Sequence, residues 1–469
     1  MVLLLGDRAY KLKKPIATGF LDYSTQELRE AACHREVELN RRLEPDVYLG
    51  VADVRGPDGE VCDHLVVMKR LPAERSLDSL VRAGADIHAD LRQVARKIAT
   101  FHAGADRSAV IDGAGSADAV RANWEENFTE MAPFVGAALD AGVARQVELL
   151  ARRYIDGRRR LLSSRIARGL VVDGHGDLRA DNIFCLEDGP HILDCIEFSD
   201  RLRHGDVLAD VAFLAMDLER LGRPDLAGQL LRWYAEFSAE HHPMSLEHHF
   251  VAYRAHVRAK VACLRQAQGD EAAEAEAQSL MEIAASHLHR GRVRLVLLGG
   301  TPGTGKSTLA GGVADSEGFS VLNSDKVRKE LAGIGSSEPA SAEFGQGIYS
   351  LQHTAATYTE LLKRARPLLE MGESVILDAS WRDSRWRTAA RAVAAETFTD
   401  LIQLRCTLPV EVAQARIAER RAAGGVTSDA DERIAEIIAA SFQPWPGAVE
   451  VPTDADPQSS LAQVLAAIA

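Results

Sequence analysis

Several features that would assign a chain of 469 residues to a special class of protein are missing from this sequence. No run of about 18 consecutive apolar residues is present, and the opening MVLLLGD is too short for the apolar part of a signal peptide. The six cysteines form no C-x-x-C pair and no zinc-binding spacing, so we expect reduced, mostly buried thiols. These absences predict a cytoplasmic protein without a membrane partner.

An excess of basic residues is missing as well. Lys and Arg number 55 against 68 Asp and Glu, which gives a formal net charge of -13. A surface of this charge does not hold an extended nucleic acid electrostatically, although a short end could enter a local basic pocket. What is present is an ordinary composition, 46% hydrophobic and 26% charged. The length suggests about two to four domains.

The stretch that organises the chain is VRLVLLGGTPGTGKSTL, residues 293–309. Its first part is a short apolar run of the kind that forms a strand buried on both faces of a parallel sheet, and residues 307–313 are helix-like. Between the two lies a complete G-x-x-x-x-G-K-[ST] motif. The glycines allow the backbone to turn its N–H groups inward at a helix N-terminus, which makes an anion-binding nest. The motif therefore predicts a nucleotide phosphate site.

We expect this loop to bind ATP and Mg²⁺. Lys306 would reach the β- and γ-phosphates, and the Ser307 hydroxyl would be a ligand of Mg²⁺. The predicted nucleotide-binding residues of the loop are Gly300, Thr301, Pro302, Gly303, Thr304, Gly305, Lys306, Ser307 and Thr308. Because a P-loop follows the first strand of its own domain, the residues before it must form another domain. We place the boundary near Gly291, with domains at 1–290 and 291–469.

Two carboxylates are predicted to follow later strands of the second domain. A short apolar run at 320–322 leads to Asp325, and another at 373–377 leads to Asp378. Open α/β sheets bind ligands at the carboxyl ends of their strands. Asp325, with Arg328 one helical turn later, suits a general base beside a phosphate-binding arginine. Asp378 takes a Walker-B-like position, that of a carboxylate linked to Mg²⁺.

Two groups of arginines in the second domain are further candidates. The segment after Asp378 is predicted to form a basic and aromatic patch, made of Trp381, Arg382, Arg385 and Arg387. After a strand at 400–407, a helix is expected to carry the arginines of a phosphate-binding lid next to a flexible diglycine, namely Arg416, Arg420, Arg421 and Gly424-Gly425. A solvated charged face explains these arginines equally well, and the sequence does not decide between the two.

Together, the strand and P-loop, the Asp-x-x-Arg spacing, the strand ending in Asp378 and the arginine helix resemble the small P-loop kinases. Polynucleotide kinase, gluconate kinase and zeta-toxin are members of that group. The resemblance covers nearly all of residues 292–450. It implies an α/β domain with a mostly parallel sheet, and an ATP-dependent phosphotransferase in which Asp325 deprotonates the acceptor.

The first domain begins with a predicted hairpin and a helix. The expected elements are strands at 2–5 and 8–13 around a Gly6-Asp7 turn, a helix at 26–43, and strands at 47–54 and 64–68. Lys11 and Lys13 project to one face of their strand, and Glu36 lies on the helix. A lysine strand followed by a glutamate helix is how kinase-like folds hold ATP phosphates, although surface lysines are the simpler interpretation. The segment that begins at Met68 would leave the sheet as a hinge beside an adenine.

A second chemical centre is predicted in HGDLRADN, residues 175–182, and in the hairpin that follows it. The hairpin is expected to have strands at 182–186 and 192–196 and a turn at 187–189. An aspartate (Asp177), an asparagine five residues later (Asn182) and an aspartate across the hairpin (Asp194) match the catalytic loop and metal-binding aspartate of kinases.

H-G-D-L-x-x-x-N followed by I-L-D resembles the aminoglycoside phosphotransferase and choline kinase group, which shares the protein-kinase fold. The match extends over the lysine strand, the glutamate helix, the hinge and residues 206–218. The resemblance implies that Asp177 accepts the proton of the attacking hydroxyl, and that Asn182 and Asp194 hold Mg²⁺. It also implies a pairing of Lys11 with Glu36, and a loop that is braced by His175 and fixed from a helix by Asp210.

One part of that pattern is missing. In the kinase fold a strand and a glycine-rich loop, which covers the phosphates, precede the hairpin, and this sequence begins at the hairpin. Each lost charge-assisted donor costs roughly 1.5–3 kcal/mol. We therefore expect residues 1–290 as given to bind MgATP much more weakly than the P-loop domain, unless translation starts upstream of Met1.

As a pair, the two halves resemble a family of proteins that join an aminoglycoside-phosphotransferase-like domain to a small P-loop kinase. We predict an α+β protein-kinase-like domain followed by an α/β P-loop domain. The predicted activity is transfer of the γ-phosphate of ATP to a hydroxyl of a small molecule. The alternative is a nucleotide-gated ATPase switch, whose degenerate kinase-like domain serves as a binding or regulatory module. The sequence names neither the acceptor nor the oligomeric state.

Overall fold

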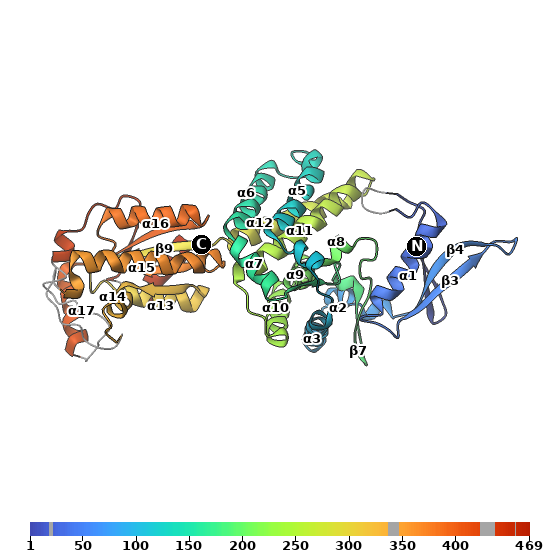
Figure 1. The fold of residues 1–469 in the computed structure, drawn as a ribbon, viewed down its shortest axis with the longest axis horizontal. Coiled ribbons are helices and arrows are strands. Elements are labelled where there is room, and N and C mark those ends of the chain that lie inside the picture. Colours follow the sequence, from blue (N-terminus) through green and yellow to red (C-terminus); the bar gives the residue numbers. More distant parts are fainter. Residues whose placement is uncertain (18–21, 336–346, 423–436, 455) are drawn as a thin grey trace. The chain divides into compact units, whose positions relative to one another are not determined.

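The structure is a computed structural model that describes residues 1–17, 22–335, 347–422, 437–454 and 456–469, except for the side chains of residues 420–422. The chain divides into two compact units, drawn in Figure 1. The first unit comprises Met1–Arg152, Leu162–His242 and Leu246–His289. The second comprises Arg153–Leu161, Pro243–Ser245 and Arg290–Ala469. Among the described helices, none combines the length and the apolar character needed to cross a membrane.

The first unit begins with a four-stranded antiparallel sheet in the order β1-β2-β4-β3. Its strands are β1 (Val2–Leu5), β2 (Arg8–Leu12), β3 (Tyr48–Arg55) and β4 (Val61–Lys69). Leu5 pairs with Arg8, which confirms the predicted two-residue turn at Gly6-Asp7. Helix α1 (Gln26–Asn40) packs against β3 and β4 around a small apolar core. This core fixes the helix beside β2, which carries Lys11 and is followed by Lys13.

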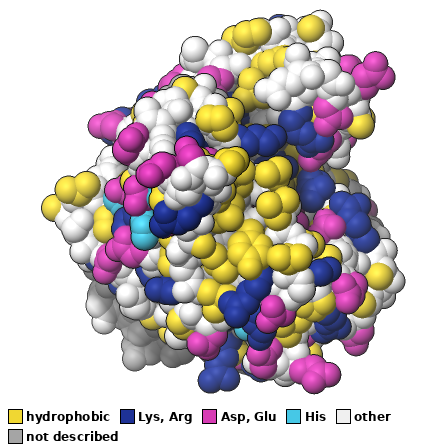
Figure 2. All heavy atoms as spheres, turned by 90° about the vertical axis from the view of Figure 1, so that its right-hand side faces the viewer, with side chains coloured by type: hydrophobic (Ala, Val, Ile, Leu, Met, Phe, Trp, Pro, Cys, Tyr) yellow, Lys and Arg dark blue, Asp and Glu magenta, His cyan; other side chains and the backbone are white. Residues whose placement is uncertain are grey.

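Strand β1 is an edge of this sheet, and all four of its side chains are exposed, Leu5 to 72%. Figure 2 views the molecule from the end at which this sheet lies in Figure 1. Hydrophobic side chains are visible on that face among Lys, Arg, Asp and Glu. In contrast, Lys11 of β2 is partly buried, and Lys13, which follows β2, is fully buried, because both side chains pair with Glu36 of α1.

Helices dominate the part of the chain that follows the first sheet. They are α2 (Leu77–Arg82), α3 (His88–Gly104), α4 (Ala109–Ala114), α5 (Ala117–Met131), α6 (Ala141–Gly157), α7 (Arg159–Ala167), α8 (Asp200–Arg203), α9 (Val207–Arg220), α10 (Pro224–Ser238), α11 (Met244–Ala267) and α12 (Ala272–Arg290). Short 3₁₀ turns are η1 (Ala73–Arg75), η2 (Ala132–Phe134) and η3 (Ala180–Asn182). Twelve successive residues of α9, Val207 to Leu218, are buried. Helix α9 is therefore a rigid internal support for the loops that pack on it.

Two small antiparallel sheets accompany these helices, β5 (Val171–Asp173) with β8 (His204–Asp206) and β6 (Ile183–Leu186) with β7 (Gly189–Ile192). The predicted second hairpin strand at 192–196 is wrong. Gly189 pairs with Leu186, so the turn has only two residues and β7 ends earlier. The following segment bonds the HGDLRADN loop instead, with Leu193 N donating to Asn182 O at 2.9 Å. Asp194 therefore lies beyond the hairpin, next to that loop.

The second unit is built on a five-stranded parallel sheet in the order β10-β11-β9-β12-β13. Its strands are β9 (Arg294–Gly299), β10 (Ser320–Asn323), β11 (Val375–Asp378), β12 (Asp400–Thr407) and β13 (Val449–Pro452). Its helices are α13 (Lys306–Glu317), α14 (Ser324–Leu331), η4 (Gly347–Tyr349), α15 (Leu351–Glu370), α16 (Ser384–Glu396), α17 (Val410–Ala422) and α19 (Pro457–Ile468). The mostly parallel sheet predicted from the sequence is confirmed.

The order of the strands positions the functional segments of the second unit. Strand β9 is central and every residue in it is buried. Apolar side chains of α13 and α19 form one core with those of the sheet. Because β11 and β10 lie on one side of β9 and β12 and β13 on the other, the segments that follow these strands flank the P-loop from two sides.

Candidate functional site

The P-loop joins β9 to α13, and its shape depends on glycine. Gly300, Gly303 and Gly305 have φ values of 137°, 82° and 79°, a region that residues with a side chain rarely adopt. A Cβ on Gly300 would lie 2.6 Å from the carbonyl oxygen of Cys406, and one on Gly303 would lie 2.6 Å from that of Ala413. The loop therefore has no room for a side chain at either position. Without side chains there, the backbone N–H groups of the loop can approach a phosphate closely.

Lys306 is the first residue of α13, where the backbone N–H groups have no partner within the helix. Its Nζ donates to the carbonyl oxygen of Thr301 at 2.8 Å. Thr304 is 1% exposed, and its hydroxyl donates to the same oxygen at 2.7 Å, which ties the loop together from inside. The N-terminus of α13 and the Lys306 ammonium therefore both place positive charge at this loop.

A cavity of about 670 Å³ lies beside this loop. Seven of the nine predicted nucleotide-binding residues of the loop line this cavity, namely Gly300, Pro302, Gly303, Gly305, Lys306, Ser307 and Thr308. The other two, Thr301 and Thr304, do not line it. Residues that follow β10 and β11 line one side, and residues of α17 and of the segment after β13 line the other. The cavity thus extends to both sides of the P-loop, and we refer to the parts on the two sides as its two compartments.

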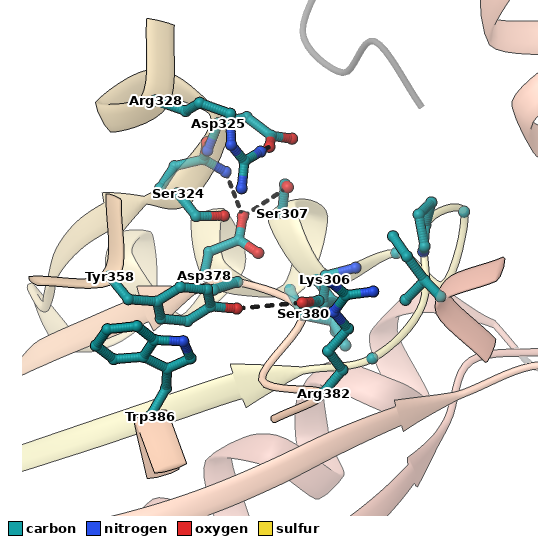
Figure 3. Close-up of a pocket in the computed structure, with 18 of the residues that line it drawn as sticks. Lys306, Ser307, Ser324, Asp325, Arg328, Tyr358, Asp378, Ser380, Arg382 and Trp386 are labelled. Atoms are coloured by element: carbon teal, nitrogen blue, oxygen red, sulfur yellow. Dashed lines mark hydrogen bonds and ion pairs between the residues drawn. The ribbon is translucent and has the colours of Figure 1, made fainter. Parts of the chain in front are cut away.

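Ser307 and Asp378 meet at the centre of this site, as Figure 3 shows. The Ser307 hydroxyl donates to Asp378 Oδ2 at 2.6 Å, and the side-chain amide of Asn323 donates to the same oxygen at 2.7 Å. Asp378 is 2% exposed and ends β11, directly beside the P-loop strand. A hydroxyl and a carboxylate are the oxygen ligands that Mg²⁺ prefers, so these residues fit the predicted metal site. Asn323 is a site residue that the motif analysis missed, although it stands two residues before Asp325.

Asp325 lies in the first turn of α14, where Asn323 caps the helix by accepting from Asp325 N at 2.9 Å. The predicted partner is in place, because Arg328 Nη1 donates to Asp325 Oδ1 at 2.7 Å. The Asp325 side chain is 30% exposed and lines the cavity. The Arg328 guanidinium lies 4.9 Å from the centre of the Tyr349 ring. The pair therefore presents a carboxylate and an oriented cation to the compartment that follows β10.

The predicted basic and aromatic patch is only partly present. Arg382 and Arg385 line the cavity, but Trp381 is fully buried and bonds Leu377 O. Arg387 is 4% exposed and belongs to the core, with its guanidinium 5.1 Å from the Trp445 ring. The prediction is wrong for these two side chains. Trp381 turns inward in the irregular segment before α16, and Arg387 lies on the face of α16 that packs inward, and the sequence spacing shows neither.

Two aromatic residues of the cavity wall were not predicted. The rings of Tyr358 and Trp386 stack with an angle of 10° and centres 5.2 Å apart. The Tyr358 hydroxyl bonds Ser380 Oγ at 3.1 Å and accepts from Trp381 N at 3.1 Å. Figure 3 shows Tyr358 and Trp386 together on one flank of Asp378. No sequence motif marks them, because they come from two different helices, α15 and α16.

The predicted lid is described only in part. Arg416 lies on α17, lines the cavity and donates to Thr453 O at 2.8 Å, after β13. This arginine is therefore held at the wall of the compartment on the β12 and β13 side. The side chains of Arg420 and Arg421 lie outside the described part of the chain, as does Gly424-Gly425, so the lid stays a prediction.

In the first unit, the predicted lysine and glutamate are brought together. Lys11 Nζ donates to Glu36 Oε1 at 2.9 Å and also forms a short ion pair with Asp194. Burial would lower the pKa of Lys11, but the two carboxylates raise it well above its ordinary value. The pKa of Asp194 is lowered, because the attraction of Lys11 outweighs the effect of burial. Lys11 thus links β2, α1 and the segment after β7.

Lys13 has a similar role, which the sequence did not indicate. Its Nζ donates to the other oxygen of Glu36 at 2.6 Å and pairs with Glu197. Tyr23 donates to the same Glu197 oxygen at 2.5 Å, and its ring lies 5.0 Å from the Lys13 ammonium. The side chains of Lys13, Glu36 and Glu197 are 3%, 0% and 8% exposed. Lys13 is therefore a buried brace of α1, and Lys11 is the more exposed of the two lysines.

The HGDLRADN loop is held from α9 as the resemblance implies. Asp210 accepts from His175 N at 2.7 Å and from Gly176 N at 2.9 Å. His102 also contacts Asp210, at 3.2 Å, and lowers its pKa against the opposing effect of burial. The His175 ring is completely buried and bonds Leu193 O at 3.0 Å, so it braces the loop. The loop has a fixed conformation set by buried polar contacts.

Asp177 and Asn182 lie together on this loop. Asn182 donates to Asp177 Oδ2 at 3.2 Å, and Arg179 Nε lies 3.0 Å from both Asp177 carboxylate oxygens. Arg179, which the motif pattern treats as variable, is therefore a partner of the predicted base. Met68 pairs with Ala9 near the end of β4, at the edge of the apolar core of the sheet. The chain leaves the sheet one residue later, which is the place predicted for the hinge.

Comparisons with known proteins agree with this division. A family model described as "Phosphotransferase enzyme family" matches residues 21–247, and one described as "AAA domain" matches residues 295–445. Proteins of Mycobacterium tuberculosis and Mycobacterium bovis, both termed uncharacterized, are 43% identical to this chain over 465 residues. The alignment covers 99% of this chain and 92% of each relative.

Several solved structures of kinases are similar to one part of the chain. A choline/ethanolamine kinase family protein from Mesorhizobium loti is 16% identical, with 61% of this chain and 87% of that chain covered and a TM-score of 0.38. The adenosine phosphosulfate (APS) kinase of Mycobacterium tuberculosis is 22% identical, with 38% and 98% covered and a TM-score of 0.30. A gluconokinase from Sinorhizobium meliloti is 17% identical, with 38% and 91% covered and a TM-score of 0.27.

Proposed function

The chain belongs to the family of these mycobacterial proteins, and in this chain a kinase-like domain of the phosphotransferase enzyme family precedes a P-loop kinase domain. On this premise, we propose that the second unit transfers the γ-phosphate of ATP to a hydroxyl of a small molecule. The observation that carries the proposal is the meeting of Ser307 and Asp378 at 2.6 Å beside the P-loop, with Asp325 on the wall of the same cavity.

The compartments of the cavity suggest where the two substrates bind. The side formed by α17 and the segment after β13 holds Arg416 and takes the nucleoside end of ATP. The opposite side, after β10 and β11, holds Asp325 and takes the acceptor. The triphosphate then lies over the P-loop, where Lys306 and the N-terminus of α13 balance its negative charge.

In the proposed reaction, Asp325 accepts the proton of the acceptor hydroxyl. The hydroxyl oxygen forms a bond to the γ-phosphorus while the bond between that phosphorus and the β–γ bridging oxygen breaks, and ADP leaves. Arg328 keeps the Asp325 carboxylate oriented, and Lys306 counters the charge that develops on the transferred group. Mg²⁺, when bound by Ser307 and Asp378, supplies further charge neutralisation on the phosphates.

We propose a second, kinase-like nucleotide site in the first unit. Lys11, oriented by Glu36, binds phosphate oxygens there, and Asn182 and Asp194 hold Mg²⁺. Asp177 is the base of that site, with Arg179 beside it. The contacts that support this proposal are the ion pairs of Lys11 with Glu36 and Asp194 and the bracing of the loop by Asp210.

The experiment that tests the proposal measures transfer of label from [γ-³²P]ATP by the full-length protein to a panel of hydroxyl compounds. We expect Asp325→Asn to lower acceptor phosphorylation about 100-fold or more while ATP binding changes little, because the base acts only in the chemical step. Glu330→Gln is the matched control, since Glu330 lies on the same helix and pairs with Arg364 outside the cavity. Hydrolysis of ATP with no labelled acceptor in the whole panel would favour an ATPase switch instead.

A further inference from the structure

The charged residues that line the compartment after β10 and β11 indicate which chemical class of acceptor can bind there. Among the described residues, three carboxylates line it, Asp325, Asp378 and Asp383. Asp378 is committed to Ser307 and Asn323, and Asp325 is paired with Arg328. Asp383 caps α16 and lies 3.0 Å from Arg385 Nε. Each described carboxylate of this wall therefore already has a polar or cationic partner.

The cations of the same wall are Arg328, Arg382 and Arg385. The Arg328 side chain is 11% exposed, and that of Arg385 is 57% exposed, so Arg328 is much the more enclosed of these two. A guanidinium carries five N–H donors in a planar fork. Arg328 uses Nη1 for Asp325, and its buried Nε–H has no hydrogen-bond partner in the described part of the chain. Arg328 thus has more N–H donors than the acceptors around it. For a largely buried cation, an anionic partner with several oxygen atoms would satisfy these donors.

The surroundings of Arg328 also fix its direction. The Tyr349 ring lies 4.9 Å from the guanidinium carbon and covers one face of the fork. With one edge held by Asp325, the remaining edge is the one that can meet a ligand in plane. The stacked rings of Tyr358 and Trp386 provide an apolar wall in the same cavity. The compartment therefore combines a base, an oriented cation and an aromatic surface.

We infer that the acceptor of the second unit is a hydroxyl compound that also carries an oxyanion, either a carboxylate or a phosphate monoester. Arg328 binds the oxyanion, Asp325 accepts the proton of the hydroxyl, and the carbon skeleton packs against the Tyr358 and Trp386 wall. The inference rests on the proposed phosphotransferase function and names its acceptor class.

Matched pairs of compounds test this inference. The full-length protein with Asp177→Asn, which removes the predicted base of the first unit, is assayed with [γ-³²P]ATP. The pairs are gluconate and glucose, glucose 6-phosphate and glucose, and adenosine 5′-monophosphate and adenosine, and kanamycin is the cationic member. We expect at least one anionic compound to have a kcat/KM about 100-fold above that of its neutral counterpart. Whether gluconate or a phosphate ester is preferred identifies the oxyanion.

Variants then assign the preference to Arg328. Arg328→Gln is expected to reduce the anionic-to-neutral ratio of kcat/KM to below about tenfold, and Arg328→Lys to keep part of it, because the charge remains and the fork is lost. Arg364→Gln, a charge loss on α15 away from the cavity, leaves the ratio unchanged. Preferred turnover of a neutral compound or of kanamycin overturns the inference but leaves the kinase function standing. ATP hydrolysis without any labelled acceptor overturns both.

Discussion

The candidate sites of the two units place positive charge in physically different ways. In the second unit the cradle is mainly backbone: glycines with positive φ, the first turn of α13, and one lysine that bonds a carbonyl of its own loop. In the first unit the positive charge comes from side chains. Two lysines, two glutamates and an aspartate form a connected set of ion pairs there. The site of the second unit therefore depends on glycines that leave space for its backbone, and the site of the first unit depends on the balance of buried charges.

The difference has consequences for what each unit tolerates. A backbone cradle keeps its donors whatever the pH, but it fails when a side chain fills the turn. A buried ion-pair set is tolerant of small changes in shape, but the removal of one member leaves another charge uncompensated. Loss of a charge should therefore do most harm in the first unit, and substitution of a glycine should do most harm at the P-loop of the second unit.

The largest effect is expected for Glu36→Gln in the first unit. Glu36 is completely buried and holds Lys11 and Lys13, so loss of its charge should destabilise this unit by about 3–5 kcal/mol. Hydrogen exchange of peptides from α1, followed by mass spectrometry in increasing urea, measures this locally. Glu38→Gln on the same helix is the control, because Glu38 is 69% exposed and should contribute less than about 0.5 kcal/mol. Equal effects of the two variants would show that the ion-pair set is not a support of α1.

Gly303→Ala in the second unit should weaken MgATP binding about 10- to 100-fold. The added Cβ would meet the Ala413 carbonyl at 2.6 Å, and the φ of 82° is unfavourable for alanine. Isothermal titration calorimetry on the full-length protein measures the affinity. Gly311→Ala is the control, since Gly311 lies inside α13 with nothing within 4 Å of its added Cβ. That control should bind as the wild type does, and its helix should be up to about 1 kcal/mol more stable. Unchanged binding by Gly303→Ala would contradict the close-approach role of the loop.

A smaller, pH-dependent effect is expected at His242, another buried ion pair of the first unit. His242 lies between Glu240 and Glu247, and although burial alone would lower its pKa, these carboxylates raise the pKa to about 9. A histidine whose folded pKa is raised contributes stability that is fully present below its unfolded pKa of about 6.5 and is lost as the pH rises through about 9.

His242→Gln should therefore lower the free energy of unfolding by about 2 kcal/mol at pH 7 and by little at pH 10. Urea unfolding at a series of pH values, compared with the exposed neighbour substitution His241→Gln, gives the measurement. A stability loss that stays constant from pH 6 to pH 10 would mean that the imidazolium charge is not what holds this segment.

The local features of both sites could be predicted from the sequence, because they are encoded in short spacings. The P-loop, Asp325 with Arg328, and Asp378 follow strands whose ends are set by apolar runs, and the parallel order of those strands then brings the residues together. Glu36 was placed beside Lys11 by the resemblance. The sequence could not show that Lys13 shares the same carboxylate, because Glu197 and Tyr23 reach it from distant positions in the chain.

Other features depended on tertiary packing that no spacing reveals. Trp381 and Arg387 have the same sequence signature as their exposed neighbours, yet both are buried against core groups. The predicted end of β7 is wrong because residues 193–196 leave the hairpin and bond the HGDLRADN loop. Tyr358 and Trp386 meet only when α15 and α16 pack together.

The central claim is that phosphoryl transfer occurs at the P-loop of the second unit, and one comparison tests it most directly. Phosphorylation of the preferred hydroxyl compound from [γ-³²P]ATP is measured with full-length Lys306→Ala and full-length Asp194→Ala. We predict that Lys306→Ala lowers the rate about 100-fold or more, because the only lysine of the P-loop is lost, and that Asp194→Ala retains most of it. Full transfer by Lys306→Ala together with loss of transfer in Asp194→Ala would contradict the claim and assign the reaction to the first unit.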